Sequence, residues 1–363
     1  MIKLNEYGVV DFTPNDDDMR HIGMIEDFLN SRSIPYETDE NIFGLYYLND
    51  KTLQLRYVSS IHYPMDNSKR FGEKCNGVQH DYFINISHAN HDKGIRTIWI
   101  FDFEMEQKNT IVTDEGVTIE NFPRQWEVIK NTICTATGNI DNRIYARDCE
   151  VREISNKEAR MFLDTNCFYG YRSASVTMAL FLKKDKCGLK KGTMLMVYSF
   201  GANFYGNKKC QDKPKIEIIR VSTKLGCQVI GGMSKCLKHF LEQYPTMKVG
   251  EREVEVDKLV FYVDASHNDS RGMQASGLAF NFVNWEGCGF MNYFCEDCCV
   301  TIERDGKKQM LQGKKGEVFH RKPMFHSAIM KLIEEGKLIS VANAGTIVFD
   351  MTRDEFLGRF KEE

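Results

Sequence analysis

Residues 216–240 read IEIIRVSTKLGCQVIGGMSKCLKHF, and this stretch decides the fold expected for the second half of the chain. The β-rich run at 216–221 predicts a strand, and apolar side chains at helical spacing predict a helix over 235–244. A strand, a glycine pair and a new helix N-terminus leave backbone N–H groups free to bind an anion such as pyrophosphate. The alternative is that the glycines only permit a tight turn. The predicted cofactor-binding residues are Gly231, Gly232, Ser234 and Lys235.

The length and composition of the chain predict two packed domains. A chain of 363 residues exceeds what one hydrophobic core usually organises, and 42% hydrophobic residues supply enough apolar surface for two cores. No stretch reaches the roughly 18 apolar residues that a membrane helix needs, so we expect no membrane insertion. Twelve cysteines at irregular spacing, without a signal sequence, predict reduced thiols. A turn-rich boundary at Gly138 and Asp141 gives expected domains at 1–140 and 141–363.

The first of these domains is expected to be a small α/β sandwich. Asn15 can cap a helix that runs to about residue 30. The β-rich runs at 43–48 and 52–58 predict a hairpin, because the short turn between them tolerates positive φ angles. A helix is predicted over 80–92, and a buried strand over 95–103.

The second domain is expected to open with a strand at 144–154. Ser155 and Glu158 have the spacing of a capping box, which predicts the start of a helix. Two apolar runs, at 174–182 and 194–200, are joined by a basic turn and predict an antiparallel hairpin.

Five sequence blocks and a tail, in a fixed order, carry a resemblance to a known family. They are IYARDCEVREISNKEARMFLDTN at 144–166, GYRSAS at 170–175, the stretch at 216–240, YVDASHNDS at 262–270, FMNYFCED at 290–297, and HSAIMKLIEEGKLISVANAGTIVFD at 326–350. Together they resemble the C-terminal part of phage homing-endonuclease-like proteins. That part is similar to Mom-type DNA-modification enzymes, which implies a GNAT-like fold.

In the same family the N-terminal part is a nuclease of the very-short-patch-repair type. HDYFINISHANHDKGIRTIWIFDFEM at 80–105 resembles its helix and strand. The expected fold class is therefore α/β (α+β), with a small endonuclease-like N-terminal domain. A GNAT-like mixed-sheet domain with a C-terminal helix-hairpin extension is expected to follow it.

The nuclease residues that the resemblance implies are replaced in this chain. Gly44 and Arg56 stand where two hairpin carboxylates are expected to hold a divalent metal ion, and Phe83 stands where a histidine is expected. An arginine does not ligate Mg²⁺, and a phenylalanine transfers no proton. His62 lies near an expected imidazole position, although a single histidine on a strand is more often structural. We therefore expect no metal-dependent nuclease activity.

The transferase-like half keeps part of its family pattern. Arg220, Asp264, Asn292 and Tyr293 match, whereas Cys167 replaces the histidine of an Asn-His pair. A buried ion pair and strand-end packing would explain the matched residues equally well. Cys167 would be nucleophilic beside a basic group. No cofactor is the main expectation, and an acyl-CoA is the alternative.

A second candidate site is a zinc ion bound by four C-terminal residues. Cys295 and Cys298 have knuckle-like spacing, and two downstream histidines would complete a tetrahedral set. Reduced packing cysteines are the favoured interpretation, because the spacing fits no established zinc finger. The four candidate ligands are Cys295, Cys298, His320 and His326.

Charge argues against strong nucleic-acid binding by the whole surface. The net charge is −3, which is unlike a protein that neutralises many phosphates. Basic runs in the second half would still allow a local face that contacts phosphates. The alternative interpretation is that these runs are solvated loop tips. The lysines that would carry such a face are Lys190, Lys191, Lys208 and Lys209.

Three functions follow from these observations. The main expectation is a phage-encoded, catalytically inactive binding or adaptor protein that recognises phage or host proteins, because the nuclease residues are missing. The alternatives are a DNA-binding homing-type protein and a GNAT-like transferase that modifies a nucleobase or a protein. The expected location is the cytoplasm of an infected bacterium, with a phage replication compartment as a narrower alternative.

Overall fold

The computed structural model describes most of the chain, and the described residues form two compact units. The description leaves out residues 1–3, 7, 67–76, 114–115, 203–214, 250, 271–277, 279, 287–289, 305–306, 321–325 and 361–363. Unit 1 comprises Met1–Gln107, Asp264–Asn268 and Glu286–Thr346, and unit 2 comprises Lys108–Val263, Asp269–Trp285 and Ile347–Glu363. The domain limits at 1–140 and 141–363 stay a prediction, because compact packing does not by itself identify a domain of a given family. Within the described residues, no helix is long and apolar enough to span a membrane.

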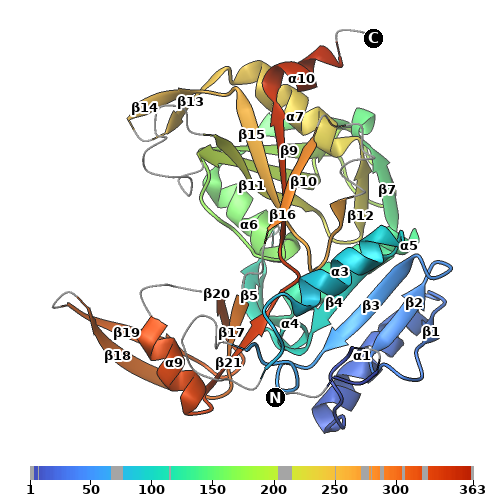
Figure 1. The fold of residues 1–363 in the computed structure, drawn as a ribbon. Helices are drawn as coiled ribbons and strands as arrows, with labels where there is room; N and C mark the ends of the chain where they lie inside the picture. The colour runs from blue at the N-terminus through green and yellow to red at the C-terminus, as the bar shows by residue number, and fades with distance from the viewer. Residues whose placement is uncertain are drawn as a thin grey trace. The chain divides into compact units, whose positions relative to one another are not determined.

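Unit 1 contains a four-stranded sheet with a helix on each face (Figure 1). The sheet order is β1-β2-β3-β4, and β3 and β4 run parallel while the other neighbours are antiparallel. The Tyr57 hydroxyl of β3 donates to Asp18 of α1 at 2.9 Å, and the Trp99 indole of β4 donates to Ser87 of α3 at 2.9 Å. Trp99 pairs with Arg56, the residue before Tyr57, and successive strand residues point to opposite faces of a sheet. Tyr57 and Trp99 therefore point to opposite faces, and so do the helices α1 and α3 that they contact. The elements are α1 (Asp16–Ser31), β1 (Glu37–Thr38), β2 (Leu45–Leu48), β3 (Leu53–Val58), α3 (Tyr82–Asp92), β4 (Arg96–Phe101) and α4 (Asp102–Glu106).

Local signals in the sequence explain where these elements begin and end. The Asn15 side chain accepts a hydrogen bond from Asp18 N at 2.9 Å and caps α1. Asn49 and Asp50, at φ 51° and 52°, form the turn between β2 and β3. Gly94, at φ 77°, follows α3 and lets the chain turn into β4. The predicted helices, hairpin and buried strand of this region are therefore confirmed.

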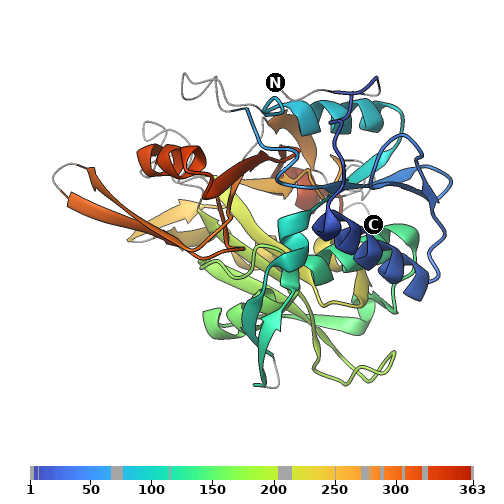
Figure 2. The same ribbon diagram turned by 90° about the horizontal axis from the view of Figure 1, so that it is seen from below.

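The rest of unit 1 consists of a small sheet, a two-stranded hairpin and a helix. The small sheet has the order β20-β17-β21, and β18 pairs with β19. Helix α9 packs along the hairpin, where Ala328, Ile329 and Leu332 contact Leu311 in one apolar cluster (Figure 2). The elements are β17 (Phe290–Phe294), β18 (Cys298–Arg304), β19 (Lys307–Gly313), β20 (Val318–His320), α9 (His326–Glu334) and β21 (Leu338–Ala342).

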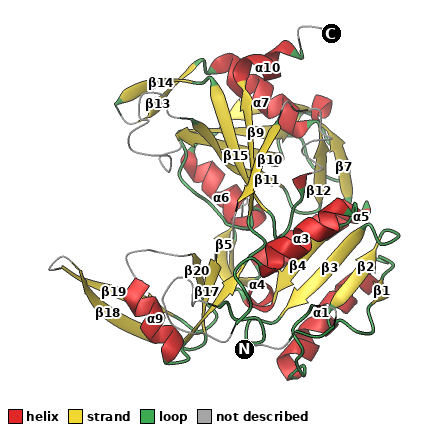
Figure 3. Ribbon diagram, in the orientation of Figure 1, coloured by secondary structure: helices red, strands yellow, loops and turns green. Residues whose placement is uncertain are grey.

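Unit 2 is built on a seven-stranded mixed sheet with the order β16-β22-β15-β11-β10-β9-β8 (Figure 3). Strands β8, β9, β10 and β11 are antiparallel neighbours, and β11 and β15 run parallel. The strands of this sheet are β8 (Cys149–Glu153), β9 (Val176–Leu182), β10 (Met194–Ala202), β11 (Ile216–Thr223), β15 (Lys258–Asp264), β16 (Asn281–Glu286) and β22 (Thr346–Thr352).

Two helices cover opposite faces of this sheet. Val197 of β10 packs with Phe162 and Leu163 of α6, whereas the adjacent Met196 lies against Gly232 at the start of α7. Successive strand residues point to opposite faces, so α6 and α7 lie on different sides. The remaining elements are β5 (Asn109–Val112), β6 (Thr118–Phe122), α5 (Arg124–Thr137), β7 (Asn142–Tyr145), η1 (Ala146–Asp148), α6 (Asn156–Asn166), β12 (Cys227–Ile230), α7 (Gly232–Gln243), β13 (Thr246–Val249), β14 (Arg252–Glu255) and α10 (Arg353–Gly358).

The expected α+β class is confirmed, and three details differ from the predictions. The single strand predicted at 144–154 is divided by η1 into β7 and β8. Helix α7 begins at Gly232 rather than residue 235, because the glycine pair itself forms the helix start. The two strands after α9 do not form the predicted hairpin, since β21 pairs with β17 and β22 belongs to the seven-stranded sheet.

The turn at Gly44 gives a stability prediction for unit 1. Gly44 has φ 71°, and a Cβ added there would lie 2.7 Å from Tyr57 Cβ. Left-handed strain and overpacking together should cost Gly44→Ala about 3 kcal/mol of unfolding free energy. The control is Gly336→Ala at φ 69° with open space around it, which should cost about 1 kcal/mol. Chemical denaturation measures both, and equal costs would contradict the close approach to Tyr57.

Candidate functional site

The parallel strands β11 and β15 are paired at their start, and their pairing ends before their carboxyl ends. Registered pairs join Ile216–Ile218 to Leu259–Phe261, and no pair joins the later residues of the two strands. Beyond Ile218, β11 stays paired with β10 on its other edge. Beyond Ile218, β15 no longer supplies ladder partners to the backbone of β11, although Ile219 O already accepts a hydrogen bond from Arg220. A ligand with amide groups can supply such partners, since buried backbone donors and acceptors need them. Openings at the carboxyl ends of parallel strands are common ligand sites.

The crossover after β11 brings a helix N-terminus toward the sheet. Gly231 caps α7 at φ 74°, and no cap side chain bonds the first turn. Among the described residues, no group accepts a hydrogen bond from the N–H of Gly232, Met233 or Ser234. These three N–H groups and the positive end of the helix dipole favour an anion.

The two glycines and Lys235 also have structural roles. A Cβ on Gly232 would lie 2.8 Å from Met196 Sδ and 3.0 Å from Val229 Cγ1, so a larger residue there would have to displace these side chains. The Lys235 ammonium donates to Ala146 O at 2.9 Å and to Cys149 O at 2.6 Å, which ties α7 to the start of β8. Of the predicted cofactor residues, the backbone of 232–234 can therefore bind an anion, whereas the Lys235 side chain is already engaged.

Arg220 and Cys167 lie together under the C-terminal end of α6. Arg220 Nε donates to Gly170 O at 3.0 Å, and its Nη1 donates to Ile219 O at 2.8 Å. Burial lowers the pKa of Arg220. Burial raises the pKa of the Cys167 thiol, although Arg220 and Arg124 oppose that shift. Cys167 is thus beside basic groups, as a nucleophile requires, but its burial keeps it a thiol.

Half-buried Glu217 is a carboxylate of β11 that sequence reasoning missed. It pairs with Val260 of β15, within the registered part of the two strands. Burial raises the pKa of Glu217, whereas Arg172 and Arg220 lower it. A carboxylate of this kind suits proton transfer, because its pKa is moved toward neutrality.

The other residues of the transferase pattern lie in unit 1. Asp264 Oδ2 is 3.4 Å from His267 Nδ1, and the Nε2 of the same ring is 3.2 Å from Glu104. Burial would lower the pKa of His267, but Glu104 and Asp264 raise it to about 10. The charged imidazole of His267 lies between two buried carboxylates and compensates their negative charge. Asp264 therefore has a structural role here. Removing His267 would leave two buried carboxylates without a cation.

Asn292 and Tyr293 are also held by packing in unit 1. Asn292 is fully buried, and its Oδ1 accepts a hydrogen bond from Ser340 Oγ at 2.7 Å. The Tyr293 ring stacks on Phe103 at 5.9 Å, and burial raises its pKa to about 12. These contacts give both matched residues a structural explanation.

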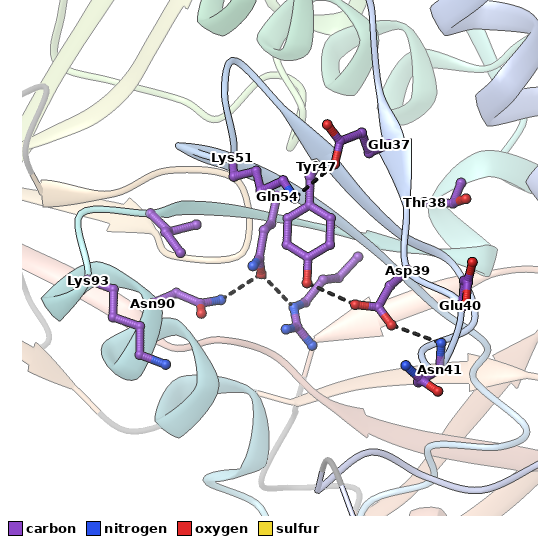
Figure 4. Close-up of a pocket in the computed structure, with 12 residues that line it drawn as sticks. Glu37, Thr38, Asp39, Glu40, Asn41, Tyr47, Lys51, Gln54, Asn90 and Lys93 are labelled. Carbon is purple, nitrogen blue, oxygen red and sulfur yellow. Dashed lines mark hydrogen bonds and ion pairs between the residues drawn. The ribbon is translucent and has the colours of Figure 1, made fainter.

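Arg56, at one of the positions expected to hold a nuclease residue, lines a polar pocket of about 700 Å³ (Figure 4). Arg56 Nε donates to Gln54 at 3.1 Å, and Asn90 donates to the same amide oxygen at 2.9 Å. Figure 4 also shows Tyr47 reaching Asp39, at 3.0 Å. A guanidinium stands in this wall where a metal-binding carboxylate is expected, and although Glu37, Asp39 and Glu40 also line the pocket, no three such side chains among the described residues are arranged to hold a metal ion.

Gly44 and Phe83 are equally unsuited to nuclease chemistry. Gly44 provides a turn, and its carbonyl accepts a hydrogen bond from Tyr57 N at 2.9 Å. The Phe83 ring is fully buried and meets the Trp99 ring edge-on at 4.9 Å. Both positions are used for packing rather than for metal binding or proton transfer.

A connected chain of polar side chains on the α1 face is a feature that sequence reasoning largely missed. His62 Nε2 is 3.2 Å from Asp18, the Tyr57 hydroxyl donates to Asp18, and His21 Nδ1 is 3.1 Å from the Tyr57 oxygen. His21 Nε2 is 3.1 Å from Glu106, and this contact is the largest cause of a pKa near 2 for that carboxyl. The chain fixes α1 to β3 and α4, which supports the structural interpretation of His62.

The predicted zinc site stays a prediction, because the side chains of His320 and His326 lie outside what the structure describes. Cys298 packs against the apolar cluster that contains Leu311 and Leu332, as expected of a packing cysteine. His320 ends β20 and His326 begins α9. Throughout the described part of the chain, no group of three or more His, Cys, Asp or Glu side chains is arranged to hold a metal ion.

The basic loop between β9 and β10 is partly neutralised. Lys190 Nζ is 3.0 Å from Asp185, and Lys191 N donates to the same carboxylate at 2.8 Å. Lys186 forms an ion pair with Asp148. Lys208 and Lys209 lie outside the described residues. The described lysines therefore offer less free positive charge than their number suggests.

Comparison with known proteins adds no family assignment. No protein-family model matches this sequence, and a search of curated proteins gives no match.

The burial of Cys167 predicts selective thiol reactivity within unit 2. Cys167 is 7% exposed and its pKa is raised by burial, whereas Cys187 is exposed on the basic loop. Alkylation of the native protein at pH 8, mapped by mass spectrometry, should label Cys187 at least about tenfold faster. Equal labelling in the native protein would contradict the structure, and equal labelling after denaturation is the control.

Proposed function

We propose that unit 2 is a GNAT-like group-transfer domain that binds an acyl-CoA in the opening between β11 and β15. The observation that carries this proposal is the end of the β11–β15 register at Ile218 and Phe261. The resemblance of 216–240 to Mom-type enzymes, and the parallel crossover through α7, support it from sequence and topology.

The residues around the opening have the donors that such a cofactor needs. The amide groups of a pantetheine chain can pair with the unpaired edge of β11 as another strand would. The N–H groups of Gly232, Met233 and Ser234 can hold its pyrophosphate at the start of α7. When bound, the cofactor would supply an activated acyl thioester, and the protein would supply binding and orientation.

Glu217 is the residue that we propose for proton transfer in unit 2. Its side chain is half-buried at the start of the opening, and burial raises its pKa. A carboxylate in this state can accept a proton from an acceptor amine. Cys167 is not proposed as the nucleophile, because burial keeps its thiol protonated.

A second candidate function is a non-catalytic binding or adaptor protein that recognises phage or host proteins. It is favoured by Gly44, Arg56 and Phe83, which serve turn, hydrogen-bonding and packing roles at the expected nuclease positions. DNA binding through the basic loop has weaker support, since Asp185 bonds both Lys190 and the Lys191 backbone. For each candidate we propose action in the cytoplasm of an infected bacterium.

Acetyl-CoA should stabilise the protein against thermal unfolding. At 100 times Kd, a ligand that binds only the native state adds about 2.7 kcal/mol. Ser234→Asp should remove most of the shift, because a carboxylate in the first turn of α7 repels the pyrophosphate while favouring the helix itself. Ser234→Asn is the matched control without the charge and should keep the shift.

The outcomes separate the two candidates. A shift that Ser234→Asp removes and Ser234→Asn keeps supports the transferase. No shift for the unchanged protein, at acetyl-CoA concentrations up to the millimolar range, would contradict the transferase and favour the adaptor. A shift that is unaffected in Ser234→Asp would place the cofactor away from α7 and contradict the proposed site.

A further inference from the structure

We propose that Arg124, Ser199 and Arg220 form a phosphate-binding site on the α6 face of unit 2, and that this site holds a phosphate group of the acceptor substrate. The assignment to an acceptor rests on the proposed transferase function. The phosphate site itself rests only on the geometry of unit 2.

Two guanidinium groups converge on Gly170, in the loop after α6. Arg220 Nε donates to Gly170 O at 3.0 Å. A Cβ built on Gly170 would lie 3.0 Å from Arg124 Nη1 and 3.2 Å from its Cζ. Arg124 is the first residue of α5, and Arg220 lies in the middle of β11. Two elements far apart in sequence thus bring like charges to one point, which is unfavourable without an anion.

Buried donors without partners occur at the same place. Arg124 Nε is buried and has no hydrogen-bond partner among the described residues, while its Nη1 donates to Asp164 O at 3.2 Å. Ser199 is fully buried, and within the same described part of the chain its Oγ has no partner either. Ser199 pairs directly with Arg220 across β10 and β11, so both side chains point to the same face of the sheet. Buried polar groups are rarely left unpaired, and a ligand would satisfy these.

The local charge balance also favours an anion. Asp164 Oδ1 is 4.0 Å from Arg124 Nη1, and the same oxygen accepts a hydrogen bond from Tyr171 N at 2.9 Å. Glu217 offsets Arg220 only in part, because burial raises its pKa. Among the described residues, the two arginines are therefore only partly neutralised.

The donor set fits a phosphate better than a carboxylate. One planar guanidinium already pairs both oxygens of a carboxylate, whereas two guanidiniums and a hydroxyl can bond three oxygens of a tetrahedral phosphate. The exposed Tyr169 ring lies 5.7 Å from the Arg220 guanidinium, at the rim of the site. An aromatic ring beside a phosphate site also suits a nucleotide, because a base can stack on it. A nucleotide, free or within a strand, is the acceptor that this chemistry fits.

Thermal unfolding with inorganic phosphate tests the site directly. The titration is made at constant ionic strength in the Ser234→Asp background, so that the start of α7 does not contribute. Phosphate should raise Tm, and Arg124→Gln should weaken its binding about tenfold or more. Ser199→Ala should weaken binding without lowering the Tm of the free protein, because it removes an unpaired hydroxyl. Lys191→Gln removes one exposed positive charge elsewhere and should leave phosphate binding unchanged.

Two further arms separate the sources of the phosphate. Adenosine monophosphate and a short single-stranded DNA are titrated in the same way. Tighter binding of the DNA assigns the acceptor to a nucleic acid, and tighter binding of the mononucleotide assigns it to a free nucleotide. Either order, together with loss of binding in Arg124→Gln, supports the phosphate site.

A second measurement keeps the test valid if Arg124→Gln does not fold. Phenylglyoxal modifies arginines, and mass spectrometry reports the rate at each one. Phosphate should slow the modification of Arg124 and Arg220 by about tenfold and leave exposed arginines unchanged. No protection, or a Tm shift that is equal in Arg124→Gln, would overturn the site. In a chain that keeps Ser234, acetyl-CoA should still raise the Tm of Arg124→Gln. Failure of the phosphate site is therefore distinguishable from failure of the proposed acyl-CoA site.

Discussion

The sheet of unit 2 changes from antiparallel to parallel pairing at β11, and both proposed binding sites lie along this strand. Parallel neighbours need a crossover, and the chain makes this crossover through β12 and α7 between β11 and β15. The register between the two strands covers only Ile216–Ile218 and Leu259–Phe261. The edge of β11 that faces β15 is thus without ladder pairs beyond Ile218, and the same connection brings the N-terminus of α7 after β11. Cofactor binding on the α7 face and phosphate binding on the α6 face would then use the same strand.

The buried polar side chains of unit 1 have structural roles. Its polar side chains are used for stability: His267 joins Glu104 to Asp264, and Tyr57 joins α1 to β3. Removal of one partner from such a group of buried ions strongly destabilises the folded state, because it leaves an uncompensated buried charge. Arg56 lines a hydrogen-bonded pocket instead of a metal site.

Much of the fold follows from local sequence signals, and much of the candidate site does not. The cap at Asn15, the turn at Asn49 and the capping box at Ser155 have local causes, so the sequence predicts them correctly. The separation of β21 from β22 depends on long-range pairing, which periodicity does not reveal. Arg124 and Arg220 meet only through the packing of α5, α6 and β11. The sequence pointed to Arg220 through the motif resemblance, and a polar Ser199 within an apolar strand was a further signal for that place.

The most direct measurement of the opening is amide hydrogen exchange along β11 and β15, with and without acetyl-CoA. Exchange reports which backbone N–H groups gain a partner, so it distinguishes binding at the strand edge from binding elsewhere. The peptide that covers residues 219–223, beyond the last registered pair, should exchange more slowly when acetyl-CoA is present. Residues 177–181 of β9, which are paired on both edges, should not change. Unchanged exchange at 219–223 under saturating acetyl-CoA would contradict ligand binding between β11 and β15.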